Sequence, residues 1–498
     1  MAGSTWVYAP LKLKKFEVKT GSLSKAFSWM AFGAIFQVIV QFTQLAILVR
    51  LLTPQDYGIF AIVIVSYGLA MIISDMGLNS AYIKNQKITK SQRSTLFWLG
   101  MCLAGVSMLI LNITAPIVAI FFSMNEASLA IKIISIALII SALGAQIKAQ
   151  CEKEMQFPRV VKVEIVASIF SFSAAVFMAL NDPGIYVLVY AYLVNVTIST
   201  ILYWLFLRDG WLPILQFSIV DVKGFWQFGV HLSGHRLLNN VITNLDVMIA
   251  ARLLSPVQLG LYSVPRNFLL KIQLVLNPVI NRISFPYISK ISQDKDKVAA
   301  SYLAVMQIIS VVNVPIYLGI LFFAEDFTRL YFGDQWANEW HIVAILSAWG
   351  LFKSFMNPVG SLLMGMGKTD LSLKWAVWVL LFSFPILYFG SWYGKEGVSI
   401  SMLFLSVFLL IAGWFYLIKP LCSLGFSSYF FEITKSIAIG LGAFSIGSLT
   451  VLGVQTVILS LSIGVTVSIV TYILFTKYFN FVVYQKIVAL FKGELNEL

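Results

Sequence analysis

An eleven-residue motif occurs twice in this 498-residue chain and indicates that the chain is built from two related halves. Residues 50–60 read RLLTPQDYGIF and residues 252–262 read RLLSPVQLGLY, with five identities. Each copy follows an apolar stretch long enough to cross a bilayer, and each opens another such stretch. A repeat of this period is far too long for a solenoid unit. The sequence therefore predicts two homologous membrane lobes.

The motif also carries the residues that begin a helix. Its N-cap, first and third helical positions are Thr53, Pro54 and Asp56 in the first copy and Ser255, Pro256 and Gln258 in the second. A serine or threonine N-cap with an acidic or amide residue at the third position forms a capping box, and proline suits the first helical position. A helix start could thus be the whole role of the motif. The evidence for a duplicated chain does not depend on whether the motif has a further role.

The composition places the chain in a membrane. Hydrophobic residues make up 59% of the sequence and charged residues only 11%, which no ordinary soluble protein of this length shows. The apolar segments are each about 20 residues long, as a helix requires to cross a hydrocarbon core. Ten-residue alternating segments, the signature of an outer-membrane barrel, do not occur. The predicted fold class is an all-α polytopic membrane protein with about fourteen transmembrane helices.

Basic residues outnumber acidic ones by 35 to 22, but they alternate between loops and do not form one nucleic-acid-binding face. They gather before the first span, after the second, around the loop at 148–162, near 282–297 and in the C-terminal tail. By the positive-inside rule these loops and both termini are cytoplasmic. We expect membrane lipid as a partner and no nucleic acid.

Several kinds of chemistry are missing from the sequence. It has no glycine-rich phosphate loop, so direct ATP hydrolysis is excluded and no cofactor is expected. His231 and His235 are four residues apart but lack the glutamate and the third ligand of a zinc site, so no metal is expected. No serine or cysteine nucleophile has a base in a recognisable pattern, which predicts no catalytic residues.

Polar residues inside the predicted spans are the best indication of a site, because ionisable side chains in a bilayer usually face a cavity. On the seventh span His235, Arg236, Asn239, Thr243 and Asp246 share a stripe within about 140°. The predicted substrate-binding residues are Arg266, Arg236, Lys271, Lys353, His235, Asn239, Asn277, Gln37 and Gln41, and the predicted ion-coupling residues are Asp75 and Asp246. Hydrogen bonding between helices is the alternative role for the amides, and pairing with Arg236 or Arg266 is the alternative for Asp246. A cavity with more cations than carboxylates would suit a phosphate or diphosphate.

Several short segments, in their order and spacing, resemble one transporter family over nearly the whole chain. They are RLLTP and YG at 50–58, SDMGL at 74–78, Gln92 with STLFW at 94–98, FG at 228–229, NLD at 244–246, LGLY at 259–262, FP at 285–286, FGDQW at 332–336 and GMGKT at 365–369. Together they are similar to the Wzx-like lipid-linked oligosaccharide flippases of the multidrug/oligosaccharidyl-lipid/polysaccharide superfamily. The colanic-acid and teichuronic-acid exporter group is the most similar branch.

That resemblance implies two six-helix lobes around a central cationic cavity, with two additional C-terminal helices. The implied boundaries are 1–210 for the first lobe, 211–227 for an interfacial linker, 228–420 for the second lobe, and 421–498 for the last two spans and a cytoplasmic tail. It also implies alternating-access transport of an undecaprenyl-diphosphate-linked oligosaccharide across the bacterial cytoplasmic membrane. Polysaccharide polymerase and other assembly proteins are implied partners.

Two other functions compete with this interpretation. A multidrug antiporter of the same fold would export hydrophobic cations and use membrane carboxylates, which an excess of cations in the cavity disfavours. A polysaccharide polymerase or ligase would need a large extracytoplasmic loop, whereas the longest such stretch, residues 325–340, is short.

Overall fold

The computed structural model describes residues 20–85, 88–215, 218–481 and 483–485, and all their regular elements are helices. Eleven helices within these ranges are long and apolar enough to cross a membrane. Three further helices, α1, α8 and α9, contain 32, 35 and 36 residues. Counting these three gives the fourteen that the sequence predicts, and the all-helical polytopic fold class is confirmed.

The first half of the chain forms a bundle of seven α-helices and one π-helical turn. They are α1 (Thr20–Leu51), α2 (Pro54–Asp75), α3 (Leu78–Lys84), α4 (Lys90–Phe121), α5 (Asn125–Lys153), α6 (Phe157–Asn181), α7 (Ile185–Leu202) and η1 (Tyr203–Leu207). The short helix α3 follows a sharp bend, since Met76 and Gly77 both have positive φ, 39° and 66°.

The second half begins with two very long helices and ends with a helical pair. Its elements are α8 (Ile219–Leu253), α9 (Pro256–Ile291), α10 (Lys295–Phe322), α11 (Ala324–Tyr331), η2 (Asp334–Glu339), α12 (Trp340–Ser354), α13 (Asn357–Gly365), α14 (Thr369–Ser391), α15 (Gly394–Gly413), η3 (Trp414–Ile418), α16 (Lys419–Leu421), α17 (Phe426–Leu449) and α18 (Val457–Phe479). Because α8 begins at Ile219, it starts inside the stretch 211–227 that the sequence predicts to be a linker.

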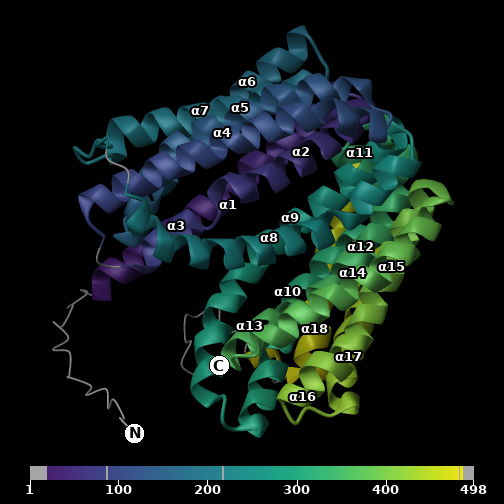
Figure 1. Ribbon diagram of the computed structural model, residues 1–498. Helices are drawn as coiled ribbons and strands as arrows, with labels where there is room; N and C mark the ends of the chain where they lie inside the picture. The colour runs from purple at the N-terminus through teal and green to yellow at the C-terminus, as the bar shows by residue number, and fades with distance from the viewer. Residues whose placement is uncertain (1–19, 86–87, 216–217, 482, 486–498) are drawn as a thin grey trace, which may run out of the picture.

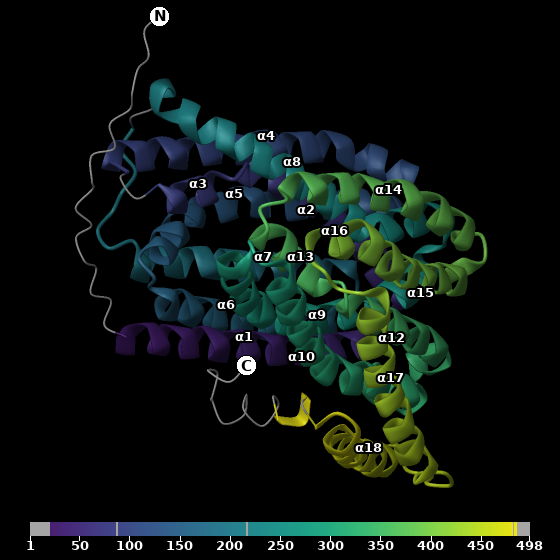
Figure 2. The same ribbon diagram turned by 90° about the horizontal axis from the view of Figure 1, so that it is seen from below.

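The two halves diverge as the arms of a V (Figure 1). The first lobe forms the upper arm and the second lobe the lower right arm, and the arms meet near α11. Helices α17 and α18 pack against each other on the outside of the second lobe (Figure 2). We call the end of the molecule where α2 and α9 begin the crossing end, and the end where α4 begins and α5 ends the basic end.

Large apolar side chains cover the outer faces of the helices. On α4, Ile113, Ile117 and Ile120 are 69%, 61% and 75% exposed, and they recur at helical spacing. In water an apolar stripe of this kind would promote aggregation. In a bilayer the same side chains face lipid tails, and their exposure carries no free-energy cost. The exposure pattern therefore agrees with a membrane location.

Both copies of the repeated motif begin a helix, as their sequences predict. Asp56 N donates to Thr53 Oγ1 at 3.3 Å and Thr53 N donates to Asp56 Oδ2 at 2.9 Å, which completes the capping box of α2. At α9, Gln258 N donates to the N-cap oxygen Ser255 Oγ at 3.3 Å. The helix-start explanation of the motif is thus confirmed.

The two copies of the motif also contact each other at the crossing end. A Cβ atom added to Gly58 would lie 1.9 Å from the carbonyl oxygen of Pro256, and one added to Gly260 would lie 1.7 Å from the carbonyl oxygen of Pro54. The contact is reciprocal, as expected of related halves. Only glycine permits this approach of two backbones, so the motif serves a second purpose beyond starting a helix.

A segment of the second lobe reinforces this closure. Trp336 Nε1 donates to the carbonyl oxygen of Val49 at 3.0 Å, and Tyr331 Oη donates to that of Phe42 at 2.7 Å. The guanidinium of Arg50 donates to the carbonyl oxygen of Leu330. We call residues 324–339, which comprise α11 and η2, the latch, because they hold the end of α1 against the second lobe.

Helix α8 belongs to both lobes. Its N-terminal part packs on the bend between α2 and α3, where a Cβ atom on Gly229 would lie 2.2 Å from the carbonyl oxygen of Met76. Its C-terminal part packs on the second lobe, where Leu245 and Ile249 form a buried cluster with Leu387 of α14 and Leu405 of α15. Polar residues on α8 can therefore face the first lobe even though the sequence repeat assigns this helix to the second.

Candidate functional site

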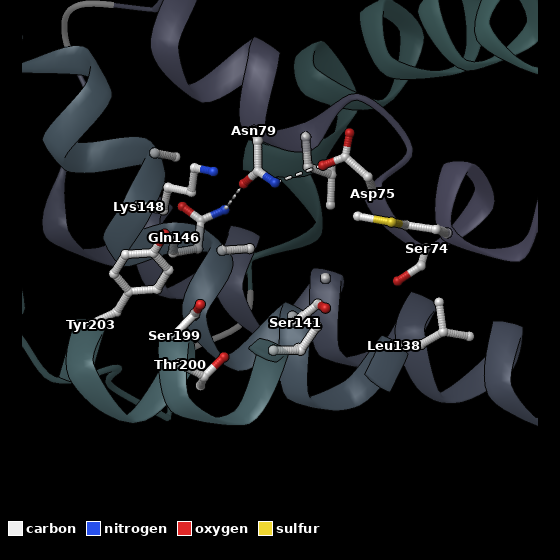
Figure 3. A pocket seen from close by; sticks show the side chains of 18 of the residues that line it. Ser74, Asp75, Asn79, Leu138, Ser141, Gln146, Lys148, Ser199, Thr200 and Tyr203 are labelled. Carbon is white, nitrogen blue, oxygen red and sulfur yellow. Dashed lines mark hydrogen bonds between the residues drawn. The ribbon is translucent and has the colours of Figure 1, made fainter. Parts of the chain in front are cut away.

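A cavity of ≈ 840 Å³ lies within the first lobe, with α8 along one side. Its wall draws residues from α1 to α7, from η1 and from α8. Figure 3 shows the part of the wall that α2, α3, α5, α7 and η1 form. Part of the polar lining lies toward the basic end, because it comes from the end of α2, from α3 and from the last turns of α5. The helix starts that close the crossing end contribute none of the lining.

One charged cluster in the cavity is centred on Glu164 of α6. Lys148 Nζ lies 2.7 Å from Glu164 Oε1 and 3.9 Å from Glu152 Oε1, so one ammonium group serves two carboxylates. Gln37 Nε2 donates to Glu164 Oε2 at 3.0 Å, and Tyr203 Oη donates to Glu164 Oε1 at 3.4 Å. Side chains from α1, α5 and η1 therefore converge on a single carboxylate of α6.

A second cluster joins the first lobe to α8. Arg236 Nη1 donates to Asp75 Oδ2 at 2.7 Å, and Arg236 Nη2 donates to Ser80 Oγ at 3.0 Å. The other oxygen of Asp75 accepts from Asn79 Nδ2 at 2.6 Å, and Asn79 Oδ1 accepts from Gln146 Nε2 at 3.3 Å (Figure 3). The two side chains of the ion pair are 40% and 22% exposed, so a solute can reach them.

The charge of this cavity differs from the prediction. The lining contains two cations, Lys148 and Arg236, and three carboxylates, Asp75, Glu152 and Glu164. Each charge has a partner of opposite sign within 4 Å. The cavity therefore holds ion-paired charges with one carboxylate in excess, whereas the sequence predicts an excess of cations.

Hydroxyl and amide groups supply most of the remaining polar surface. They belong to Gln41, Ser74, Ser141, Ser168, Asn195, Ser199, Thr200 and Asn240. Such groups donate and accept hydrogen bonds in a water-exposed wall without a fixed charge. Together with the two ion-paired clusters, they suit a large solute that carries many hydroxyl groups and a few charges.

Four of the residues predicted from the sequence line this cavity. They are Gln37 and Gln41 of α1, Asp75 of α2 and Arg236 of α8. Arg236 and Asp75 are brought into direct contact, although 161 positions separate them in the chain. The sequence predicts separate roles for the two residues, substrate binding for Arg236 and ion coupling for Asp75.

Arg266 and Asp246 form a separate, fully buried pair. Arg266 Nε and Nη2 donate to the two oxygens of Asp246 at 2.7 and 2.8 Å, and both side chains are at most 3% exposed. Tyr262 Oη donates to Asp246 at 2.6 Å, and the guanidinium also reaches Asn267 and the carbonyl oxygen of Thr243. This is the pairing that the sequence leaves open as the alternative role of Asp246. The pair is not among the residues that line the cavity.

The other predicted residues lie apart from the cavity lining. Lys353 Nζ lies over the Trp349 ring, 4.8 Å from its centroid. The positive charge of Arg266 is close enough to repel the ammonium group. Lys271 is half-buried on α9, and His235 and Asn239 are exposed on α8. The side chain of Asn277 lies outside the described residues. A substrate-binding role for these five remains a prediction.

The sequence did not single out several residues that the structure brings into the cavity. Lys148 and Glu152 were assigned to a cytoplasmic loop, although α5 continues to Lys153. Asn79 and Gln146 lacked any distinguishing pattern. The one usable signal was the Lys148 and Glu152 spacing of four, which marks an ion pair on a helix face.

Among the described residues, one group could hold a metal ion: Glu339, His341 and Glu396, whose ligand atoms lie within 4.8 Å of one another. Lys395 Nζ already lies 2.9 Å from Glu339 and 3.7 Å from Glu396. The lysine supplies the positive charge that the carboxylates need, so these residues do not fit a metal site well.

Comparison with known proteins identifies the family. Residues 47–340 match the family model described as Polysaccharide biosynthesis protein. The chain is 27% identical to the lipopolysaccharide biosynthesis protein WzxC of Escherichia coli over 81% of this chain and 82% of that protein. It is 25% identical to the teichuronic acid biosynthesis protein TuaB of Bacillus subtilis over 86% of this chain and 89% of that protein.

Solved structures show the same fold at low sequence identity. The lipid II flippase MurJ in an inward closed conformation aligns with 92% of this chain and 99% of its own, with a TM-score of 0.73 and 14% identity. An inward-facing multidrug transporter of the MATE family aligns with 77% of this chain and 94% of its own, with a TM-score of 0.63 and 13% identity. The chain therefore belongs to the Wzx-like polysaccharide biosynthesis family, a family of membrane transporters and not of enzymes, with the fold of the MurJ and MATE proteins.

Proposed function

We propose that this protein is a flippase for an undecaprenyl-diphosphate-linked oligosaccharide, the repeat unit of a bacterial surface polysaccharide. The observation that carries the proposal is the ≈ 840 Å³ polar cavity inside a membrane lobe. The names of WzxC and TuaB, a lipopolysaccharide and a teichuronic acid biosynthesis protein, support a saccharide substrate.

The chemistry of such a substrate explains why a cavity is needed. Sugar hydroxyls and phosphates that enter hydrocarbon lose water without finding new hydrogen-bond partners, which costs several kcal/mol for each group. The serine, threonine, asparagine and glutamine side chains of the cavity replace that water. The polyprenyl chain can remain in the bilayer while the head group moves through the protein.

Arg236 is the residue in this proposal that contacts the diphosphate. It is the cavity's guanidinium, and a guanidinium binds phosphate oxygens through two parallel hydrogen bonds. In the described conformation Asp75 occupies that position. Incoming phosphate would replace Asp75 as the partner of Arg236, and this would weaken a contact between α2 and α8.

Alternating access follows from the same geometry. In the described conformation the crossing end is closed by the glycine contact and by the latch, while the cavity lies toward the basic end. We assign the basic end to the cytoplasm of a bacterial inner membrane by the positive-inside rule. Loading would then occur from the cytoplasm, and release would require the crossing end to separate. Polysaccharide polymerase would receive the translocated unit on the far side.

Replacement of Arg236 tests the proposal in cells whose surface polysaccharide depends on this protein. Arg236→Gln should reduce the export of polysaccharide about tenfold or more, because a charge-assisted contact is lost. Arg236→Lys should restore part of the export, since the charge returns without the bidentate geometry. Lys374→Gln is the control, because Lys374 is a cation that is exposed and does not line the cavity. Normal export by Arg236→Gln, at an unchanged membrane level, would contradict the proposed role.

An ion-coupled multidrug antiporter is a second candidate, and one observation favours it. The cavity contains three carboxylates, which are the groups that an antiporter of hydrophobic cations would use. Export of a fluorescent cationic dye from vesicles with an imposed pH gradient distinguishes the two functions. Dye export that stops in Glu164→Gln would support the antiporter, and the absence of dye export with intact polysaccharide export would support the flippase.

A further inference from the structure

A second pocket, separate from the cavity of the first lobe, opens at the basic end. It has a volume of ≈ 560 Å³ and lies between α3, the start of α4, the end of α5 and the irregular stretch after η1. Its wall shares no residue with the cavity described above. Neither the flippase proposal nor the sequence assigns it a role.

The pocket has an excess of positive charge. Its cations are Lys90, Arg93 and Arg208, and its carboxylates are Glu154 and Asp209. Both carboxylates already have partners. Asp209 accepts two hydrogen bonds from Arg159, each at 2.9 Å, which hold the pKa of Asp209 below its ordinary value and keep it ionised.

Glu154, the other carboxylate, accepts hydrogen bonds from two side-chain amides. Gln156 Nε2 donates to it at 2.8 Å, and Gln150 Nε2 donates to its other oxygen. Lys90 and Arg208 are both exposed at the rim. Because the guanidinium of Arg159 adds a further cation beside Asp209, the surroundings of the pocket attract anions.

Two hydrogen-bond donors in the wall lack a partner. They are Arg93 Nε and Trp211 Nε1, and both atoms are buried. Trp211 is only 9% exposed, and the Arg93 guanidinium stacks on its ring, 3.9 Å from the centroid. A buried donor without an acceptor costs free energy, which an acceptor oxygen in the pocket would recover.

Aromatic packing keeps this wall in place. Trp211 packs against Phe97 and Trp204, with ring centroids 5.9 and 6.4 Å away. The chain after it is tied to α4, because Trp98 Nε1 donates to the carbonyl oxygen of Ile214 at 3.0 Å and Ile214 N donates to Ser94 Oγ at 3.0 Å. Tryptophans of this kind mark the membrane–water interface, so the pocket lies at the depth of lipid headgroups.

We infer that this pocket binds a phosphate group, held by Arg93, Lys90 and Arg208 and by the indole N–H of Trp211. Arginine and lysine beside the N-terminal end of a long helix form a favourable phosphate site. Basic pockets between membrane helices on the cytoplasmic side bind anionic lipid headgroups. The phosphate can come from an anionic phospholipid of that leaflet or from free phosphate in solution, and the same contacts serve both.

Thermal unfolding of the purified full chain in detergent tests the inference. The additives are phosphatidylglycerol, phosphatidylcholine and inorganic phosphate, each titrated to saturation. We expect saturable stabilisation by phosphatidylglycerol, by inorganic phosphate or by both, with half-saturation shifted tenfold or more in the variant Lys90→Gln/Arg93→Gln/Arg208→Gln. Stabilisation by phosphatidylglycerol alone identifies the lipid as the source, stabilisation by inorganic phosphate alone identifies the free ion, and stabilisation by both shows that the site accepts either.

Two controls make the result decisive. Lys132→Gln/Lys290→Gln/Lys374→Gln removes the same charge from exposed positions outside the pocket and should leave half-saturation unchanged. Lys90→Gln/Arg208→Gln changes only the two exposed rim residues, so it tests the site if the triple variant fails to fold. The pocket is not a phosphate site if neither phosphatidylglycerol nor inorganic phosphate stabilises the protein more than phosphatidylcholine does. The same conclusion follows if half-saturation shifts equally in the pocket variants and in the control variant.

Discussion

Gly58 of α2 and Gly260 of α9 lie against each other's helix starts, each where a Cβ atom would overlap a proline carbonyl oxygen of the other lobe. The contact lies at the crossing end, opposite the polar cavity of the first lobe. It gives the duplicated motif a mechanical purpose, since transport to the far side requires these two helices to separate. The same residues that begin the helices thus also form the seal between the lobes.

Gly58→Ala and Gly260→Ala should each push the two lobes apart at the crossing end. The added methyl group meets backbone atoms that cannot rotate away, so we expect about 1–3 kcal/mol of destabilisation and reduced transport. Thermal unfolding in detergent and export in cells measure the two effects. Gly105→Ala is the control, because nothing lies within 4 Å of a Cβ atom there and helix propensity improves. Equal stability of Gly58→Ala and the wild type would show that the seal is looser than the structure indicates.

Trp336→Phe should weaken the latch. The substitution keeps most of the aromatic packing against Tyr57 but removes the hydrogen bond from Nε1 to the carbonyl oxygen of Val49. A lost buried hydrogen bond typically costs about 1 kcal/mol. Since the latch holds only the closed crossing end, a cysteine at Val49, where the side chain is fully buried in that state, should become more reactive toward an impermeant thiol reagent applied outside the cell. Trp340→Phe, at an exposed tryptophan, should change neither the stability of the protein nor the reactivity of that cysteine.

Arg266→Ala and Asp246→Asn should each destabilise the fold by about 3–5 kcal/mol, because each leaves a buried group of the pair without its partner. The double variant Arg266→Met/Asp246→Leu should recover much of that loss, as apolar replacements of buried ion pairs often do. Export by this double variant separates the two roles of Arg266. Recovered export assigns it to the fold, whereas a stable variant without export would assign it to substrate.

The sequence was sufficient for the helices and the motif caps, because bilayer length and capping chemistry are local properties. It could not show that α8 packs on both lobes, since that depends on the bend at Met76 and Gly77 and on the space left by Gly229. For the same reason Arg236 and Asp75 were recognised singly but not as partners. Lys148 and Glu152, the two partners in the Glu164 cluster, were missed because charges near a helix end also fit an ordinary cytoplasmic loop.

Asp75→Asn tests whether the cavity's ion pair contributes to energy coupling. Loss of the charge removes one partner of Arg236 while preserving the shape of the side chain, so substrate binding should persist. Transport in vesicles with and without an imposed pH gradient measures the effect. Coupling through Asp75 predicts that the variant no longer responds to the gradient, and an unchanged response would place coupling elsewhere.

Translocation in proteoliposomes tests the central claim most directly. Vesicles containing the purified protein and an undecaprenyl-diphosphate-linked oligosaccharide are assayed for the fraction of head groups that reaches the opposite leaflet. The account predicts translocation by the wild type and by Lys374→Gln, and a rate at least about tenfold lower for Arg236→Gln. Wild-type vesicles that translocate no faster than protein-free vesicles, or an Arg236→Gln rate equal to that of the wild type, would contradict it.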